Sequence, residues 1–330
     1  MDISNFDYCL PKDAIAQVPL AQRDASKLLV VSDPVVHTYT RDLPNFLKEG
    51  DVVVLNETRV MPSRLNLRRA TGGAVEVLVL EENADGRWEA LVRPSRKIQD
   101  GEELLDPNGK KILSIEDITD RGSRLVRPLA GKMREIFDEH GQIPLPPYIE
   151  NKGIDSSRYQ TIFGKKESSV AAPTAGLHLT DRVIQECSAA GASIVAINLS
   201  VGIGTFRPIS TNSINNHLMH SESYHVNAHT WEIIQEAKRV VAVGTTVVRT
   251  LESVAKSGRL EGKTELYIKP GFEFEVVDAL MTNFHLPKSS LLVMVEAFMG
   301  KAWKDLYHLA LAEGYRFLSF GDAMFIERDQ

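Results

Sequence analysis

The chain has 330 residues, of which 43% are hydrophobic and 25% are charged. These values are typical of a globular protein with a sizeable core. The net charge of −6 at pH 7 argues against a broad nucleic-acid-binding surface, which must be positive, although a local basic face remains compatible with it. Cys9 and Cys187 are the two cysteines. They fit no zinc or redox spacing and suit a reducing compartment.

The sequence carries no targeting or membrane pattern. Residues 1–12 lack a basic segment followed by an apolar run, which is the pattern of a secretory signal. The longest apolar candidate, residues 291–299, contains Glu296 and is shorter than the ~18 residues that span a bilayer. We therefore expect a cytoplasmic protein without a membrane segment.

The first half of the chain predicts strands. Residues 28–31 and 52–55 are short apolar runs typical of buried strands. From about residue 60 to 127, short alternating segments follow one another, separated by turns rich in Gly and Asp. This pattern predicts a small β-barrel or sandwich. Residues 141–148 contain three prolines and are typical of a stiff linker leaving that domain.

After about residue 175, helical and strand patterns alternate. Thr180 and Thr230 are expected to cap two helices, and Ser289 or Ser290 a later one. The predicted strands are residues 193–199, 240–243, 265–268, 316–322 and 323–326. We expect an α/β main domain with an inserted small β-barrel domain. The expected limits are 1–58 and 151–330 for the main domain and 59–150 for the insert.

A glycine-containing loop follows the strand predicted at 193–199. Gly202-Ile203-Gly204 starts like a dinucleotide-binding fingerprint, but Arg207 occupies the position of the third Gly and Pro208 follows. A Rossmann site is therefore not predicted. The loop is either a ligand site at the carboxyl end of a strand or an ordinary tight turn.

A second candidate is the start of the helix at Gly244-Thr245-Thr246. The free N–H groups of a helix start bind anions, and Arg249 would add positive charge there. The alternative is an ordinary capped helix whose Arg249 pairs locally. In the loop that includes Asn283, His285 and Lys288, the basic side chains face either a site or the solvent.

Three histidines lie between His217 and His225. If residues 221–226 are extended, His220 and Glu222 share one face, and a histidine beside a carboxylate suits proton transfer near pH 7. Zinc bound by His217, His220 and Glu222 is a competing hypothesis, although the spacing is not that of His-Glu-x-x-His. A third hypothesis is that these histidines lie in a solvated loop and have no role in a site.

Basic residues cluster in or beside the expected insert, although the chain is acidic overall. The clusters are Arg59, Arg64, Arg68 and Arg69; Arg93, Arg96 and Lys97; and Arg121, Arg124, Arg127, Lys132 and Arg134. A phosphate-backbone footprint would need such clusters, but solvated strand faces would also produce them.

One motif is far more specific than the others. Residues 169–180 read Ser-Val-Ala-Ala-Pro-Thr-Ala-Gly-Leu-His-Leu-Thr and follow Arg-Tyr-Gln-Thr-Ile-Phe at 158–163. Further motifs follow the same order along nearly the whole chain, at residues 55–60, 202–208, 217–222, 244–246, 270–272, 283–287 and 320–322. The chain thereby resembles the S-adenosylmethionine:tRNA ribosyltransferase-isomerase family of queuosine biosynthesis. Leu179 stands where this family is expected to have Phe, which should affect packing alone.

The resemblance implies an α/β domain with a small β-barrel and a specific reaction. The ribosyl group of S-adenosylmethionine is transferred and rearranged onto 7-aminomethyl-7-deazaguanine at the wobble position of tRNA with a GUN anticodon. The products are epoxyqueuosine, adenine and methionine. S-adenosylmethionine is then a co-substrate, no metal or permanently bound cofactor is implied, and we expect a monomer.

The chemistry needs a base for a C5′ proton, an acid for the leaving adenine, and orientation in a site that excludes water. We expect His178, His220 and Glu222 to be the proton-transfer groups, unless the substrate amine itself is the base. The expected substrate-binding residues are Gly202, Gly204, Arg207, Thr245, Thr246, Arg249, Asn283 and His285. Among them, Arg207 and Arg249 would hold the methionine carboxylate.

The expected tRNA-binding residues are Arg59, Arg64, Arg93, Arg96 and Lys97. Two other classes of function compete with the transferase. A tRNA-binding module without chemistry needs the basic insert but neither the histidines nor the glycine loops. A zinc hydrolase needs a bound metal.

Overall fold

The computed structural model describes residues 1–119, 122–151, 153–202 and 208–328. The chain forms two compact units. Unit 1 comprises Met1–Arg59, Pro146–Lys166 and Ala172–Gln330, and unit 2 comprises Val60–Leu145 and Glu167–Ala171. The expected insert, 59–150, overlaps unit 2 but extends five residues beyond Leu145 and omits the short segment Glu167–Ala171.

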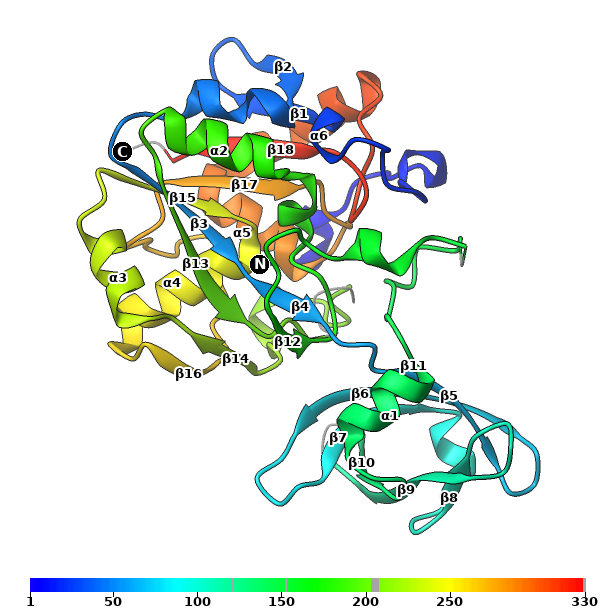
Figure 1. The fold of residues 1–330 in the computed structure, drawn as a ribbon. Helices are drawn as coiled ribbons and strands as arrows, with labels where there is room; N and C mark the ends of the chain where they lie inside the picture. The colour runs from blue at the N-terminus through cyan, green and yellow to red at the C-terminus, as the bar shows by residue number, and fades with distance from the viewer. Residues whose placement is uncertain (120–121, 152, 203–207, 329–330) are drawn as a thin grey trace. The chain divides into compact units, whose positions relative to one another are not determined.

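Unit 1 contains a mixed sheet that has nine strands in the described part of the chain (Figure 1). Its strands are β1 Lys27–Val31, β2 Val36–Tyr39, β3 Asp51–Asn56, β13 Ser193–Leu199, β14 Glu222–His225, β15 Arg239–Val243, β16 Glu261–Thr264, β17 Ala279–Asn283 and β18 Ala323–Glu327. The strand order is β16-β14-β13-β3-β15-β17-β18-β1-β2. The neighbours β13, β3, β15 and β17 run parallel, so their carboxyl ends meet at one edge.

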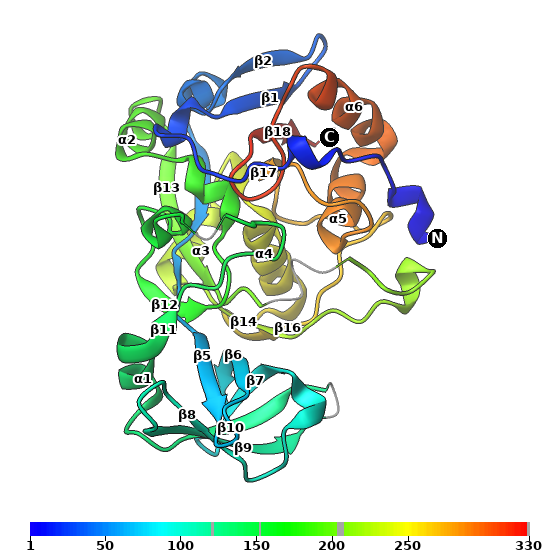
Figure 2. The same ribbon diagram turned by 90° about the vertical axis from the view of Figure 1, so that its right-hand side faces the viewer.

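Helices cover both faces of this sheet. They are α2 Asp181–Ala189, α3 Ala228–Gln235, α4 Thr245–Ser257, α5 Ser290–Met299 and α6 Trp303–Ala312. Val183 of α2 packs in one core cluster with Val53 of β3 and Val243 of β15, whereas α4 contacts β3, β13, β15 and β17 from the other side (Figure 2). Every residue of β3 and β17 is buried, as expected for strands covered on both faces.

Side-chain caps fix where three of these helices begin. Thr180 accepts the Val183 N–H at the start of α2, and Ser289 accepts the Leu292 N–H at the start of α5, as predicted. The cap predicted at Thr230 is wrong. Asn227 accepts the His229 N–H and starts α3, because an Asn at this position bonds the free amides of the first turn better than a Thr three residues later.

Two predicted strands are wrong. Residues 265–268 do not form a strand, because the Leu266 N–H bonds the Thr264 side chain at 3.1 Å and the chain leaves the sheet after β16. Residues 316–322 form a tight turn instead of a strand. Its Gly321 N–H donates to the Leu318 carbonyl and its Asp322 N–H to the Arg316 carbonyl, so these backbone groups are satisfied within the turn and not by a neighbouring strand.

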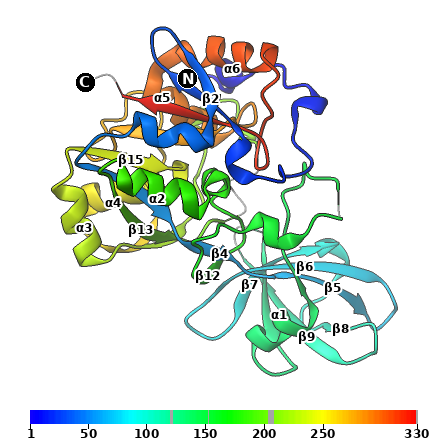
Figure 3. The ribbon, with the colours of Figure 1, turned by 45° about the horizontal axis from the view of Figure 1, so that its top comes forward.

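Unit 2 is an antiparallel barrel. Its strands are β5 Arg64–Arg69, β6 Ala74–Glu82, β7 Trp88–Arg93, β8 Glu103–Leu105, β9 Lys111–Ile118, β10 Arg124–Pro128 and β11 Gly141–Gln142, with helix α1 at Met133–His140. The order is β11-β5-β6-β7-β10-β9-β8, and a further pairing of β5 with β8 closes the barrel (Figure 3). Leu65, Val77, Ile115 and Val126 are fully buried inside it, at alternating strand positions.

A separate pair of short strands, β4 Thr58–Val60 and β12 Lys166–Ser169, lies where the chain passes between the units. The predicted fold class, an α/β main domain with an inserted small β-barrel, is confirmed. None of the helices in the described ranges is long and apolar enough to cross a membrane.

Candidate active site

The carboxyl ends of the parallel strands of unit 1 open onto a pocket, which we call the edge pocket. Val201 follows β13, Gly244 follows β15, Asn283 ends β17, and Thr245 and Thr246 begin α4. Its other lining residues are Tyr148, Ala172, Pro173, Thr174, Ala175, Thr282, Phe284, His285, Leu286, Ser289, Leu291, Leu318 and Ser319. The pocket has an empty volume of about 590 Å³, which includes space open to solvent, and this edge is where α/β sheets bind ligands.

Asn283 is the centre of a buried hydrogen-bond network in this pocket. Its side-chain oxygen accepts from the Thr174 hydroxyl at 2.9 Å. Its nitrogen donates to the Leu318 carbonyl at 3.2 Å and lies 2.9 Å from His178 Nε2. Because a carbonyl can only accept, the amide nitrogen must face Leu318, and His178 Nε2 must therefore accept as well.

His178 is consequently a neutral imidazole with its proton on Nδ1. It lies at the end of η7, Thr174–His178, and is 4% exposed. Burial and, to a smaller extent, the positive charges of Arg316 and Arg23 together lower the pKa of His178 to about 3. Such a group is a weak base at neutral pH, so the geometry favours an orienting role for His178 over direct proton abstraction.

Backbone strain adjoins this network at Leu318. Its φ of +69° lies in the left-handed region, which costs a residue with a side chain roughly 1 kcal/mol or more. The strain is held by two hydrogen bonds, because the Leu318 N–H donates to the Phe284 carbonyl and the Leu318 carbonyl accepts from Asn283. It turns residues 318–319 towards the edge pocket.

His285 is the second buried histidine of the pocket. It is 7% exposed, and its Nε2 lies 3.0 Å from the Thr282 hydroxyl. Burial lowers the pKa of His285 to about 3. Its backbone is fixed by two tyrosines, since Tyr8 donates to its carbonyl and its N–H donates to the Tyr307 hydroxyl. A neutral, fixed imidazole is suited to donating or accepting one hydrogen bond in a set orientation.

The start of α4 forms another wall. Gly244 has a φ of +98°, a conformation that favours glycine. Because glycine has no side chain, Gly244 gives the helix no side-chain cap. Thr246 receives a hydrogen bond from Asn56 of β3 at 3.3 Å. Thr245 and Thr246, at this helix start, line the pocket, and the N–H groups of a helix start can bind an anion.

Glu222 and Arg249 form an ion pair that is almost completely buried, with side chains 3% and 5% exposed. The second carboxylate oxygen of Glu222 accepts the Gly202 N–H at 2.8 Å. His220 is exposed and precedes β14, and within the described ranges Glu222 has no hydrogen bond to it. The local pairing that the sequence left open for Arg249 is present, and the expected pairing of His220 with Glu222 is replaced by it.

The predicted substrate residues are thus only partly brought together. Thr245, Thr246, Asn283 and His285 line the edge pocket. Gly202 and Arg249 do not line the pocket, and both are hydrogen-bonded to Glu222. Gly204 and Arg207 lie outside the described residues. Nε and Nη2 of Arg249 are buried without a hydrogen-bond partner among the residues that the structure describes.

A metal is not suggested by this geometry. The described residues contain no group of three His, Cys, Asp or Glu side chains that could hold a metal ion. In the zinc hypothesis, Glu222 would have to leave Arg249, which would lose its carboxylate partner in a buried position.

The basic clusters of unit 2 differ in how free their charges are. Arg69 is paired with Glu102, Arg87 with Asp85, Arg127 with Glu116, and the buried Arg124 with Asp100. Arg64 donates to the Leu145 carbonyl and lies 3.9 Å from Glu76. Arg93, Arg96 and Lys97, in contrast, are exposed and form no ion pair with a described residue. Arg59 is half-buried in unit 1.

Several lining residues received no role from the sequence, among them Thr174, Leu318 and Ser319. Thr174 lies in the motif that carried the resemblance, so its position was visible but its bond to Asn283 was not. Leu318 and Ser319 belong to the turn that sequence analysis interpreted as a strand. The alternation of apolar residues there gave no indication of a turn held by Asp322.

We expect the free energy of unfolding to fall as the pH drops from 7 to 5. The folded pKa of His178 and of His285 is about 3, whereas an unfolded histidine titrates near 6.5. Below pH 6.5 the unfolded chain therefore binds protons that the folded chain does not, and stability is lost down to the folded pKa. Each histidine loses about 2 kcal/mol at pH 5.

Urea unfolding at pH 7 and pH 5 measures this loss. In His178→Gln the loss should shrink by about half, because one of the two buried groups is gone. In His229→Gln, whose histidine side chain is 80% exposed, it should stay as in the parent chain. An unchanged loss in His178→Gln would contradict the assignment.

Comparison with known proteins agrees with the resemblance. The S-adenosylmethionine:tRNA ribosyltransferase-isomerase of Rubrobacter xylanophilus is 47% identical over 330 residues, covering 99% of this chain and 98% of that protein. The protein of the same name from Moorella thermoacetica is 45% identical over 341 residues, covering 99% and 100%. A crystal structure of S-adenosylmethionine tRNA ribosyltransferase from Thermotoga maritima is 36% identical, with a TM-score of 0.57 and coverage of 98% of this chain and 100% of that chain.

The family described as queuosine biosynthesis protein matches residues 3–326. With this match over nearly the whole chain, and with full-length relatives well above 30% identity, the resemblance stated from the sequence is confirmed: the chain belongs to the queuosine biosynthesis protein family.

Proposed function

We propose that this chain is an S-adenosylmethionine-dependent tRNA ribosyltransferase-isomerase. It transfers and rearranges the ribosyl group of S-adenosylmethionine onto 7-aminomethyl-7-deazaguanine at the wobble position, giving epoxyqueuosine in tRNA, adenine and methionine. The observation that carries the proposal is the edge pocket, where a helix start and a buried Asn283–His178 network meet at the carboxyl ends of parallel strands. Its full-length relatives bear the name of this activity.

The donor matches the chemistry of this pocket. Its methionine carboxylate is an anion, and the free N–H groups at Thr245 and Thr246 favour one. Its adenine is flat with apolar ring faces, which suit a wall formed by Phe284, Leu286 and Leu318. A pocket that excludes water also protects the carbanion-like centre formed when a C5′ proton leaves beside the sulfonium.

We propose that His178 and Asn283 act together. His178 Nε2 accepts from the Asn283 amide, which fixes how the amide and the Thr174 hydroxyl face the pocket. These groups orient the donor and hydrogen-bond the departing adenine. The base is then the substrate amine or a side chain outside this network. His220 and Glu222 keep their place as candidates for proton transfer, with Glu222 holding the Gly202 backbone.

Unit 1, and with it residues 1–58 and 151–330, is proposed to carry the chemistry, and residues 59–150 to help bind tRNA. Arg93, Arg96 and Lys97 favour this division, because their exposed charges have no acidic partner among the described residues. Arg59 and Arg64 are proposed to assist them. The proposal includes acceptor tRNAs with a GUN anticodon, a monomer in the cytoplasm, and no permanently bound cofactor.

The test is an incubation of the full chain with S-adenosylmethionine and tRNA that carries 7-aminomethyl-7-deazaguanine, followed by mass spectrometry of the digested nucleosides. We expect epoxyqueuosine and one free adenine for each nucleoside formed. The same tRNA with guanine at the wobble position is the control and should give neither product. A folded chain that binds the tRNA and leaves the donor intact would be a binding module instead.

A further inference from the structure

Three arginine side chains of unit 1 line a second pocket, which we call the arginine pocket. Arg23 belongs to η3, Arg23–Ala25, Arg158 to η6, Ser156–Tyr159, and Arg316 to the segment after α6. None of the other lining residues in the described ranges is acidic, and the open pocket has an empty volume of about 290 Å³. Its positive charge is therefore concentrated and incompletely balanced.

Each of the three guanidinium groups donates a hydrogen bond to a backbone carbonyl. The hydrogen bonds are Arg23 Nη1 to Leu177 O at 3.1 Å, Arg158 Nη2 to Leu20 O at 2.5 Å, and Arg316 Nη1 to Val18 O at 3.4 Å. Nε of Arg158 and Nη2 of Arg316 are buried and have no hydrogen-bond partner among the described residues. Buried donors without acceptors are costly, and an anion with several oxygens would satisfy them.

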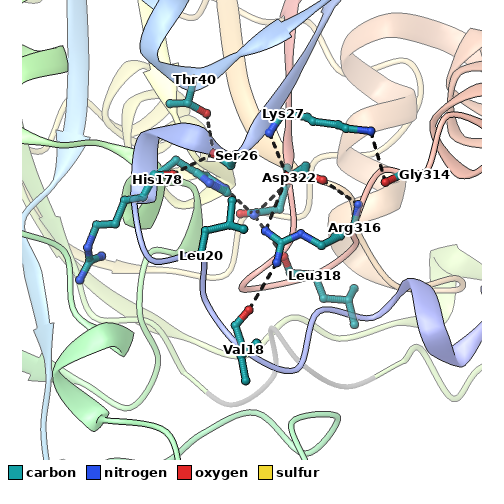
Figure 4. A network of polar contacts seen from close by, with 12 residues as sticks. Val18, Leu20, Ser26, Lys27, Thr40, His178, Gly314, Arg316, Leu318 and Asp322 are labelled. Atoms are coloured by element: carbon teal, nitrogen blue, oxygen red, sulfur yellow. Dashed lines mark hydrogen bonds and ion pairs between the residues drawn. The ribbon is translucent and has the colours of Figure 1, made fainter.

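The nearest acidic side chain only partly neutralises this charge. Asp322 lies 3.7 Å from Arg316 Nη2. Its two oxygens accept the backbone N–H groups of Lys27 and Arg316 at 2.9 and 2.7 Å. Figure 4 shows the Arg316 side chain between Asp322 and the Val18 carbonyl, with His178 in the same group of residues. Arg23 and Arg158 form no ion pair within the described ranges.

The arginines also raise the positive potential at one another. The pKa of Arg23 is lowered by burial and then by the charge of Arg158. Arg316 and Arg23 both add to the lowering of the His178 pKa. Like charges held together at partly buried positions are destabilising unless a bound anion compensates them.

We propose that the arginine pocket binds a backbone phosphate of the tRNA, beside the nucleotide that reacts in the edge pocket. This inference rests on the proposed function. The two pockets share Ser319, and His178 of the arginine pocket accepts from Asn283 of the edge pocket. A phosphate held by the three guanidinium groups therefore lies next to the edge pocket, and it fixes the position from which the reacting base enters that pocket.

A polyanion explains the surroundings better than the single carboxylate of the donor does. Arg23 and Arg158 also line a wider recess, to which Arg41 and Arg182 contribute. The recess is lined by these four arginines and by two acidic residues, Asp24 and Asp181, of which Asp24 is paired with Arg182. Positive charge therefore exceeds negative charge beside the arginine pocket, as the successive phosphates of one strand require.

The test compares Arg158→Gln and Arg23→Gln with the parent chain. The Kd for tRNA carrying 7-aminomethyl-7-deazaguanine is measured by fluorescence anisotropy at several KCl concentrations, and the Kd for S-adenosylmethionine by calorimetry. We expect about tenfold weaker tRNA binding in each variant, a salt slope smaller by roughly 0.7–0.9, and an unchanged donor Kd. Arg158→Lys keeps the charge and should keep most of the affinity.

Arg259→Gln is the matched control, because Arg259 is exposed, has no described ion pair and lies outside both pockets. Unchanged tRNA affinity and salt slope in Arg158→Gln and Arg23→Gln overturn the inference. Weaker donor binding with unchanged tRNA binding overturns it too, because the donor carboxylate would then occupy the pocket. If circular dichroism shows that one of the two variants is unfolded, the tRNA affinity of the other variant tests the inference. A parent chain that neither binds nor modifies tRNA overturns both this inference and the proposed function.

Discussion

Replacing Arg249 with methionine should lower the free energy of unfolding by about 3–5 kcal/mol. The change leaves the Glu222 carboxylate, whose side chain is 3% exposed, with the Gly202 N–H as its remaining described partner. A buried charge that loses its counter-charge is strongly destabilising, whereas removing both charges together is much less so. Urea unfolding followed by circular dichroism measures the loss.

The double variant Glu222→Gln with Arg249→Met should recover a large part of this stability, because no charge is then buried alone. Lys110→Met is the matched control, since Lys110 and its partner Glu139 are more than half exposed, and its effect should stay below about 1 kcal/mol. An equally small loss in Arg249→Met would show that solvent reaches the Glu222–Arg249 pair and that this ion pair does not contribute to stability.

Replacing His178 with alanine should lower turnover by about 100-fold with little change in the donor KM. The imidazole accepts the hydrogen bond that orients Asn283, and a small displacement of an orienting group can reduce turnover by about this factor. His178→Gln offers a side-chain oxygen in place of Nε2 and should keep turnover within about tenfold of the parent chain. Steady-state formation of the modified nucleoside measures both.

This pair of variants separates orientation from proton transfer. If His178→Gln is as inactive as His178→Ala, the imidazole itself moves a proton, which is the role that the sequence suggested. Near-normal turnover in His178→Ala would remove His178 from the site altogether. His229→Ala, at an exposed position, controls for the loss of an imidazole as such.

Much of the fold follows from short-range pattern. β13 begins and ends at the predicted residues, 193 and 199, because β-branched and apolar residues are bounded there by Gly191 and by Ser200. The cap of α2 at Thr180 was also predictable, since a hydroxyl before a helical period has few other roles. The spacing of turns predicted a small barrel or a sandwich, and the family resemblance favoured the barrel.

The failures arise where a distant residue decides the local structure. Asp322 binds the backbone of Arg316 and Lys27, so a stretch with a strand-like pattern becomes a turn. Glu222 pairs with Arg249 across 27 positions of sequence and not with the neighbouring His220. A sequence pattern contains adjacent residues only, so partners contributed by other strands are invisible to it.

The same limit applies to the candidate site. The polar loop before a predicted helix and the family resemblance suggested Asn283 and His285, which line the edge pocket, whereas strand β17, which ends at Asn283, was not predicted. Arg23, Arg158 and Arg316 were not predictable, since each stands in a separate segment with no basic neighbour that would mark a cluster. They meet only after the chain folds.

The proposed function requires above all that S-adenosylmethionine binds in the edge pocket. The most direct test is calorimetric titration of the donor into Leu286→Trp, which places a larger side chain on a partly exposed wall of the pocket. Val36→Trp, on the exposed strand β2, is the control. We expect Leu286→Trp to remain folded and to bind the donor at least tenfold more weakly, with Val36→Trp like the parent chain. Donor binding in Leu286→Trp that equals that of the parent chain would contradict the account and place the donor elsewhere.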